Sequence, residues 1–115
     1  MRERFQVLVI PFMFSEELTV AIFQRSDDQK WQFIAGGGED NESIIQTAKR
    51  ESLEEAGIEQ NNKFIQLDTV TSIPKKHFSE HKDQKGFWVI PEYCFAVKLE
   101  SQSLIFQRNI NLLFG

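Results

Sequence analysis

The segment Gly36-Gly37-Gly38-Glu39-Asp40-Asn41-Glu42 runs directly into residues 43–57, and together they decide the fold. Three successive glycines allow the backbone to approach a ligand closely, because no side chain stands in the way. The residues after Ser43 are mostly Glu, Gln, Ala, Lys, Arg, Ile and Leu, which favour a helix of about four turns. Gly57 is the residue type that most often follows a helix. The segment therefore predicts a glycine loop that leads into one strong helix.

Three glutamates of this helix share one face. Glu51, Glu54 and Glu55 stand at positions i, i+3 and i+4, so their carboxylates repel one another unless a cation neutralises them. Hard oxygen ligands gathered in this way suit Mg²⁺, Mn²⁺ or Ca²⁺, and Mg²⁺ commonly binds together with substrate phosphates. A solvated acidic face is the alternative interpretation of such a helix.

The spacing of the whole segment resembles the Nudix box, Gly-x5-Glu-x7-Arg-Glu-U-x-Glu-Glu-x-Gly-U, in which U is an aliphatic residue. The matching residues are Gly36, Glu42, Arg50, Glu51, Glu54, Glu55, Gly57 and Ile58, whereas Ser52 departs from the first aliphatic position. Such a match is expected by chance on the order of once in 10⁹ windows. The resemblance implies an α+β Nudix fold, an α/β/α sandwich with a mixed β-sheet, in a single domain that spans residues 1–115.

What the resemblance implies about function is hydrolysis of a diphosphate bond in a nucleoside diphosphate linked to a group X, with Mg²⁺ or Mn²⁺ as cofactor. Carried over by position, the catalytic residues and metal ligands are Glu51, Glu54 and Glu55, and the carbonyl of Ala35 is a backbone ligand. The supporting residues are Gly36, Glu42, Arg50 and Gly57. The alternative is a Nudix-fold nucleotide-binding or regulatory module whose turnover is impaired.

The helical phase divides the remaining positions of the helix. The residues that fall on the face toward the sheet are Ile45, Ala48, Ser52 and Ala56. We expect the Ser52 hydroxyl to bond a backbone carbonyl one turn earlier. Arg50 can reach Glu54 at i+4 and hold it in place.

Strand patterns surround the helix. The expected strands are residues 5–10, which form a strand buried on both faces and ending at Pro11, then 18–25, 31–34, 64–73, and a long strand over 87–99 with a bulge or bend at Pro91. Residues 104–115 are too few for the full second helix with which a Nudix domain normally closes. We therefore expect the C-terminal helix to be short or missing, and a homodimer that covers the exposed sheet face is a hypothesis.

A further carboxylate from outside the box is needed to complete the family's metal site, and the candidates are Glu80, Asp83, Glu92 and Glu100. Trp31-Gln32 and the strand over 87–97 are similar to the branch that handles dihydroneopterin triphosphate and dATP-like nucleotides. That branch carries a glutamate shortly after this strand, and no acid follows Glu100 here.

Substrate contacts have several candidates outside the helix. Trp31 and Trp88 could stack on a base, with core or pocket wall as the alternative. A polar loop over residues 75–86 holds His77, His81, Lys75, Lys76, Lys82 and Lys85, which are either solvated or in contact with phosphate.

Composition limits the partners and the compartment. The formal net charge is −4, and no cluster of Lys and Arg follows a path suited to a phosphate backbone, which argues against long nucleic acid. Cys94 is the only cysteine, so the chain forms no internal disulfide, as is typical of the reducing cytoplasm. We find neither a signal peptide nor a membrane span in the pattern. The expected partner is a small nucleotide or related diphosphate.

Overall fold

The computed structural model describes residues 4–14, 16–25, 27–74, 89–100 and 110–114. Its elements are β1 (Gln6–Phe14), β2 (Leu18–Arg25), β3 (Trp31–Gln32), β4 (Ile34–Gly37), α1 (Ile44–Ala56), β5 (Phe64–Pro74), β6 (Val89–Lys98) and β7 (Ile110–Phe114). The predicted loop over residues 75–86, together with Phe87 and Trp88, lies outside the described residues.

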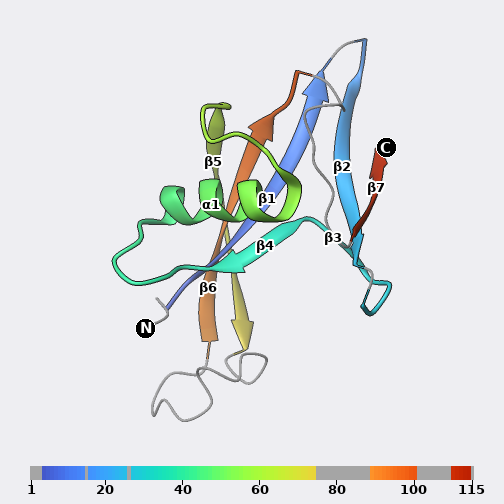
Figure 1. Cartoon of the computed structure of the whole chain (residues 1–115). Coiled ribbons are helices and arrows are strands. Elements are labelled where there is room, and N and C mark those ends of the chain that lie inside the picture. Colours follow the sequence, from blue (N-terminus) through green and yellow to red (C-terminus); the bar gives the residue numbers. More distant parts are fainter. Residues whose placement is uncertain (1–3, 15, 26, 75–88, 101–109, 115) are drawn as a thin grey trace.

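Strand β1 lies at the centre of a seven-stranded sheet with the order β3-β2-β1-β6-β5, to which β4 adds beside β1 and β7 beside β2. β1 and β6 run parallel, with Val7 opposite Tyr93. The other pairs are antiparallel. Helix α1 lies across β1 and β4 on one face of the sheet, as Figure 1 shows. The predicted α+β architecture with a mixed sheet is confirmed.

Two prolines behave differently from the sequence-based expectation. Pro11 does not end β1, because β4 pairs with residues 6–9 of that strand and β2 with residues 12–14. Pro11 therefore lies in the gap between two neighbouring strands, where a missing N–H costs no bond on that side. Pro91 causes no bulge in β6; the irregularity is in β5, between Gln66 and Val70.

The core lies between α1 and one face of the sheet. Val7 and Val9 of β1 are fully buried there, with Phe95 and Val97 of β6 beside them. On the other face, Gln6, Leu8, Ile10 and Phe12 are only half-buried and Phe14 is exposed. The prediction that β1 is buried on both faces was therefore wrong, because the described residues place a helix on one face only.

Helix α1 has defined signals at both ends. Ser43 and Gln46 form a capping box, in which each side chain accepts a hydrogen bond from the backbone N–H of the other residue. Gly57 adopts a left-handed conformation, with φ 67°, and its N–H donates to the Leu53 carbonyl at 3.0 Å. The prediction that Gly57 ends the helix is confirmed, whereas the capping box was not predicted.

The sheet-facing side of α1 follows the predicted phase. Ala48, Ser52 and Ala56 are fully buried, and Ile45 is half-buried. The predicted bond from the Ser52 hydroxyl to a carbonyl was wrong, because its Oγ has no hydrogen-bond partner among the described residues.

The C-terminal segment forms a strand. β7 pairs antiparallel with β2, with Leu112 opposite Phe23, and no residue that the structure describes forms the second helical layer of a sandwich. This fits the expectation of a short or missing C-terminal helix. Within the described part of the chain, α1 is the only helix, and it is neither long nor apolar enough to span a membrane.

Candidate metal centre

The glycine loop makes room for a carboxylate of α1. Gly36 pairs with Val7, whose side chain belongs to the buried face beneath α1. A Cβ atom added at Gly36 would overlap the carboxylate of Glu51. The φ of Gly36 is not positive, so its backbone conformation would suit other residues. Glycine is required here because the backbone and the Glu51 carboxylate approach closely.

Arg50 donates hydrogen bonds to three glutamates and to the glycine loop. Its Nε donates to Glu42 Oε2 at 2.8 Å and its Nη2 to Glu42 Oε1 at 3.0 Å, while Nη2 also donates to the Gly37 carbonyl at 2.9 Å. Its Nη1 donates to Glu51 Oε1 at 2.9 Å and Glu54 Oε2 at 3.0 Å. One guanidinium therefore orients two of the predicted ligands and attaches them to the glycine loop.

Glu42 anchors the loop to the helix. Besides Arg50, its carboxylate accepts hydrogen bonds from Thr47 Oγ1 at 2.8 Å and from the Glu39 N–H at 3.0 Å. The hydrogen bond from Arg50 is the main reason why the pKa of Glu42 falls to about 2. The carboxylate is therefore charged across the whole physiological range and has no proton to exchange.

Glu55 is in the opposite electrostatic situation. Burial raises its pKa well above the ordinary value, and the hydrogen bond and the charge of Glu51 act in the same direction. The backbone N–H of Ala35 partly offsets this by bonding the carboxylate. The two carboxylates face each other in a half-buried place, where burial and the neighbouring negative charge disfavour the ionised form of Glu55.

The donor set fits a divalent cation. Glu51 and Glu55, with the backbone of Ala35 and Gly36 beside them, would offer a cation oxygen donors of the kind that suit Mg²⁺. Among the described residues, no three His, Cys, Asp or Glu side chains already converge on one point. Glu54 is the predicted ligand that lies apart, because its side chain is 53% exposed and its carboxylate bonds Arg50.

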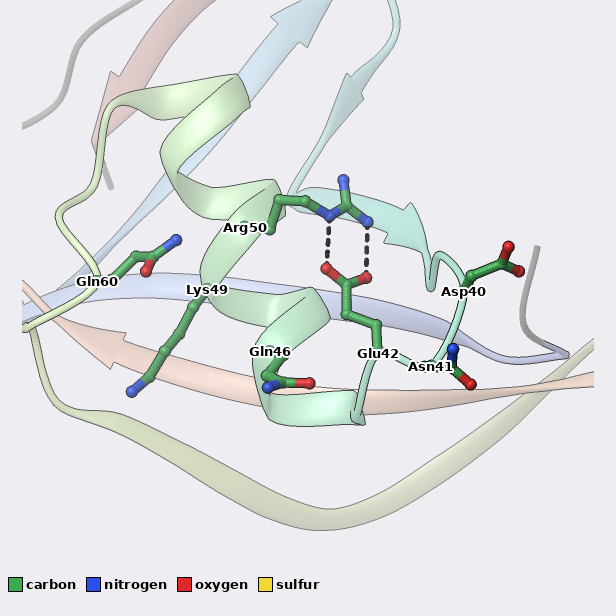
Figure 2. Close-up of a pocket in the computed structure, with 7 residues that line it drawn as sticks. All are labelled: Asp40, Asn41, Glu42, Gln46, Lys49, Arg50 and Gln60. Atoms are coloured by element: carbon green, nitrogen blue, oxygen red, sulfur yellow. Dashed lines mark hydrogen bonds and ion pairs between the residues drawn. The ribbon is translucent and has the colours of Figure 1, made fainter. Parts of the chain in front are cut away.

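A polar hollow of about 400 Å³ lies beside Arg50, as Figure 2 shows. It is lined by Asp40, Asn41, Glu42, Gln46, Lys49, Arg50 and Gln60. The two bonds between Glu42 and Arg50 form part of its wall, while Lys49 points away from that pair. Glu51, Glu54 and Glu55 do not line it, so the hollow is separate from the acidic centre.

Other predicted residues are not brought to this centre. Trp31 pairs with Gln24 of β2, and strand alternation places both on the sheet face opposite α1. Glu92 lies on that same far face and accepts a hydrogen bond from Thr71 Oγ1 at 3.0 Å. Glu100 is exposed beyond the end of β6.

The remaining candidates fall outside the described residues: Trp88, Glu80, Asp83, His77, His81, Lys75, Lys76, Lys82 and Lys85.

Arg25 is a residue that the sequence reasoning missed. It ends β2 on the same face as Ala21 and Phe23, both of which belong to the core beneath α1. Its positive charge acts on Glu55, where it opposes the larger effect of burial on the pKa. The alternation of β2 was the signal that could have placed Arg25 on the side of the acidic helix.

A mixed sheet with one packed helix, whose carboxylates are held by an arginine above a glycine loop, defines an α+β domain with an acidic centre. The family model for the NUDIX domain matches residues 3–108. The chain therefore belongs to the NUDIX family.

Solved structures agree with this assignment. A Listeria monocytogenes protein assigned to the NUDIX hydrolases is 42% identical, with a TM-score of 0.78 over 96% of this chain and 77% of that chain. The dihydroneopterin triphosphate pyrophosphohydrolase of E. coli is 23% identical, with a TM-score of 0.75 over 99% and 80%.

The NUDIX domain of Shewanella oneidensis NrtR, solved with ADP ribose, is 15% identical, with a TM-score of 0.67 over 99% and 73%. At 23% and 15% identity, the E. coli and Shewanella proteins show the fold alone. Among curated proteins, none is significantly similar to the chain.

Proposed function

We propose that the protein is a Mg²⁺-dependent pyrophosphohydrolase, able to use Mn²⁺, that cleaves the diphosphate bond of a nucleoside diphosphate linked to a group X. The observation that carries the proposal is the pair of facing carboxylates, Glu51 and Glu55, against the backbone of Ala35 and Gly36. Membership of the NUDIX family and 42% identity to the Listeria protein support a hydrolase. A small nucleotide is the proposed partner, and the cytoplasm is the proposed compartment.

The proposed ligands are Glu51, Glu54 and Glu55 with the carbonyl of Ala35. A divalent cation held there supplies charge stabilisation for the phosphates and acidifies the attacking water. Arg50 keeps Glu51 and Glu54 side by side through Nη1, and Glu42 keeps Arg50 in place. Gly36 provides the space for Glu51. The chain thus orients its acids before substrate arrives, which is the arrangement that catalysis requires.

Two glutamine variants test the ligand assignment. Glu54→Gln and Glu55→Gln should each abolish Mg²⁺-dependent phosphate release, because a neutral amide is a poor ligand for Mg²⁺. Glu59→Gln is the matched control, since Glu59 is exposed just beyond the helix. Wild-type rates in either ligand variant would contradict the assignment.

The substrate is tested with a panel of dNTPs, dinucleotides, nucleotide sugars and pterin triphosphate, each with and without Mg²⁺. Release of a nucleoside monophosphate or of pyrophosphate that occurs only when Mg²⁺ is present supports the proposal that the protein is an enzyme. The binding-module alternative predicts calorimetric binding of one of these compounds with no turnover of any of them.

A further inference from the structure

Arg50 has no N–H group left for a substrate. A guanidinium carries five N–H donors, and those of Arg50 are taken by Glu42, Gly37, Glu51 and Glu54. A diphosphate that approaches the acidic helix carries several negative charges, of which a bound cation offsets only part. A second basic side chain is therefore needed on the same face of the domain.

Arg25 is placed on that face. The core residues Ala21 and Phe23 precede it at intervals of two along β2, so the three side chains point to the α1 side of the sheet. The turn that follows holds its backbone firmly. The Arg25 N–H donates to the Lys30 carbonyl at 2.9 Å, and the Gln29 N–H donates to the Arg25 carbonyl at 3.0 Å.

The guanidinium of Arg25 is held by a weak partner. Its Nε and Nη2 donate to the two carboxylate oxygens of Asp27, each at 3.1 Å. The side chains are 43% and 64% exposed, and exposed pairs of this kind are easily exchanged. Among the described residues, Nη1 of Arg25 has no hydrogen-bond partner. A planar fork with free donors matches two oxygens of a phosphate group.

We propose that Arg25 is a substrate-binding residue that leaves Asp27 to contact a phosphate oxygen of the diphosphate substrate. The inference rests on the proposed function, because it assigns a role in binding that substrate. Arg25 is separate from the carboxylates that hold the cation, so its contact strengthens binding of substrate and transition state alike. Its loss should therefore raise KM and leave kcat nearly unchanged.

Steady-state kinetics at saturating Mg²⁺, with the best substrate of the panel, test the role. Arg25→Gln should raise KM roughly 10- to 100-fold, as expected for loss of a charged hydrogen bond, and Arg25→Lys should fall between it and the wild type. Asp27→Asn should lower KM by about two- to fivefold, because it releases the guanidinium. The matched control is Lys98→Gln, which removes one exposed positive charge on the face opposite α1.

The melting temperature, the Mn²⁺ affinity and the KM distinguish a substrate-binding role of Arg25 from a structural one. The melting temperature of Arg25→Gln and its Mn²⁺ affinity without substrate, followed by electron paramagnetic resonance, should not fall below those of the wild type. A fall in either would show a structural role and overturn the proposal. A KM equal to that of the wild type would overturn it as well.

Failure of the proposed function is distinguishable from failure of this inference. If the wild type hydrolyses no compound in the panel, the proposed function fails, and Arg25 is tested with a methylene-bridged, non-hydrolysable nucleoside diphosphate in the presence of Mn²⁺. Weaker calorimetric binding by Arg25→Gln than by the wild type upholds the role. Equal binding by the two proteins, or no binding by the wild type, overturns it.

Discussion

Arg50 donates hydrogen bonds to both carboxylate oxygens of Glu42, from Nε to Oε2 at 2.8 Å and from Nη2 to Oε1 at 3.0 Å. The two residues are eight positions apart in the chain, one in the loop and the other in the middle of α1. Only 20% of the Arg50 side chain and 16% of the Glu42 side chain are exposed. The pair therefore fixes the glycine loop relative to the acidic helix, and its removal should be measurable both in stability and at the metal centre.

The stability contributed by Glu42 should depend on pH. Its pKa is about 2 in the folded protein against 4.5 for the free group, so its contribution is fully present above pH 4.5 and is lost as the pH falls toward 2. Glu42→Gln should lower the free energy of unfolding at pH 7 by about 2–3 kcal/mol. Urea denaturation at pH 7, 4.5 and 2.5 measures the difference.

Glu59→Gln serves as the exposed control for this series and should show no such trend. A deficit for Glu42→Gln that stays the same at all three values of pH would contradict the assigned cause.

Lysine at position 50 should not reproduce the role of Arg50. An ammonium group has three donors on one nitrogen and cannot bond Glu42, Gly37 and Glu54 in the directions that the planar guanidinium reaches. We expect Arg50→Lys to lower metal affinity and turnover about 10- to 100-fold, the range found when the partners of metal ligands are changed. Mn²⁺ titration followed by electron paramagnetic resonance measures the affinity. Wild-type affinity in this variant would show that the carboxylates need no such support.

The acidic helix could be predicted from the sequence, because its three carboxylates, the arginine that bonds them and its sheet-facing side all follow from one helical period within a short segment. The path of β1 through Pro11 could not, because it depends on β4 and β2 leaving a gap beside that residue. The face on which Trp31 lies depends on its pairing with Gln24, and Arg25 becomes relevant only when β2 is placed beside α1. Pairings between distant segments are set by the folded sheet, so the alternation of β2 alone shows that Arg25 shares a face with Ala21 and Phe23 but not which layer covers that face.

The first and the third glycine of the loop should respond differently to alanine. A Cβ at Gly36 overlaps the Glu51 carboxylate, the far end of a flexible side chain, whereas a Cβ at Gly38 overlaps the ring of Phe5. Gly36→Ala should therefore reduce metal affinity about 10- to 100-fold with little loss of stability. Gly38→Ala should cost about 1–3 kcal/mol of stability by overpacking and leave metal affinity nearly unchanged.

Melting curves and Mn²⁺ titrations of the two variants separate these effects, and each variant is the control for the other. The same response in both would mean that the loop acts as a single rigid unit and that the division between site and core is wrong.

Ser52 of α1 and Ser43, the N-cap of that helix, should respond to alanine with opposite signs. The Ser52 hydroxyl is fully buried without a hydrogen-bond partner among the described residues, so Ser52→Ala removes an unsatisfied polar group and introduces a better helix former. We expect the free energy of unfolding to rise by about 1 kcal/mol. Ser43 accepts a hydrogen bond from the Gln46 N–H as the N-terminal cap, so Ser43→Ala should lower that free energy by about 1 kcal/mol.

Urea denaturation at pH 7 measures both changes on the same scale, and the identical chemical substitution in one helix makes each variant the control for the other. Turnover should be unchanged in Ser52→Ala, because the hydroxyl faces the sheet and the carboxylates lie on another side of the helix. A loss of stability in Ser52→Ala would mean that this hydroxyl has a hydrogen-bond partner in solution, and the prediction would then be wrong.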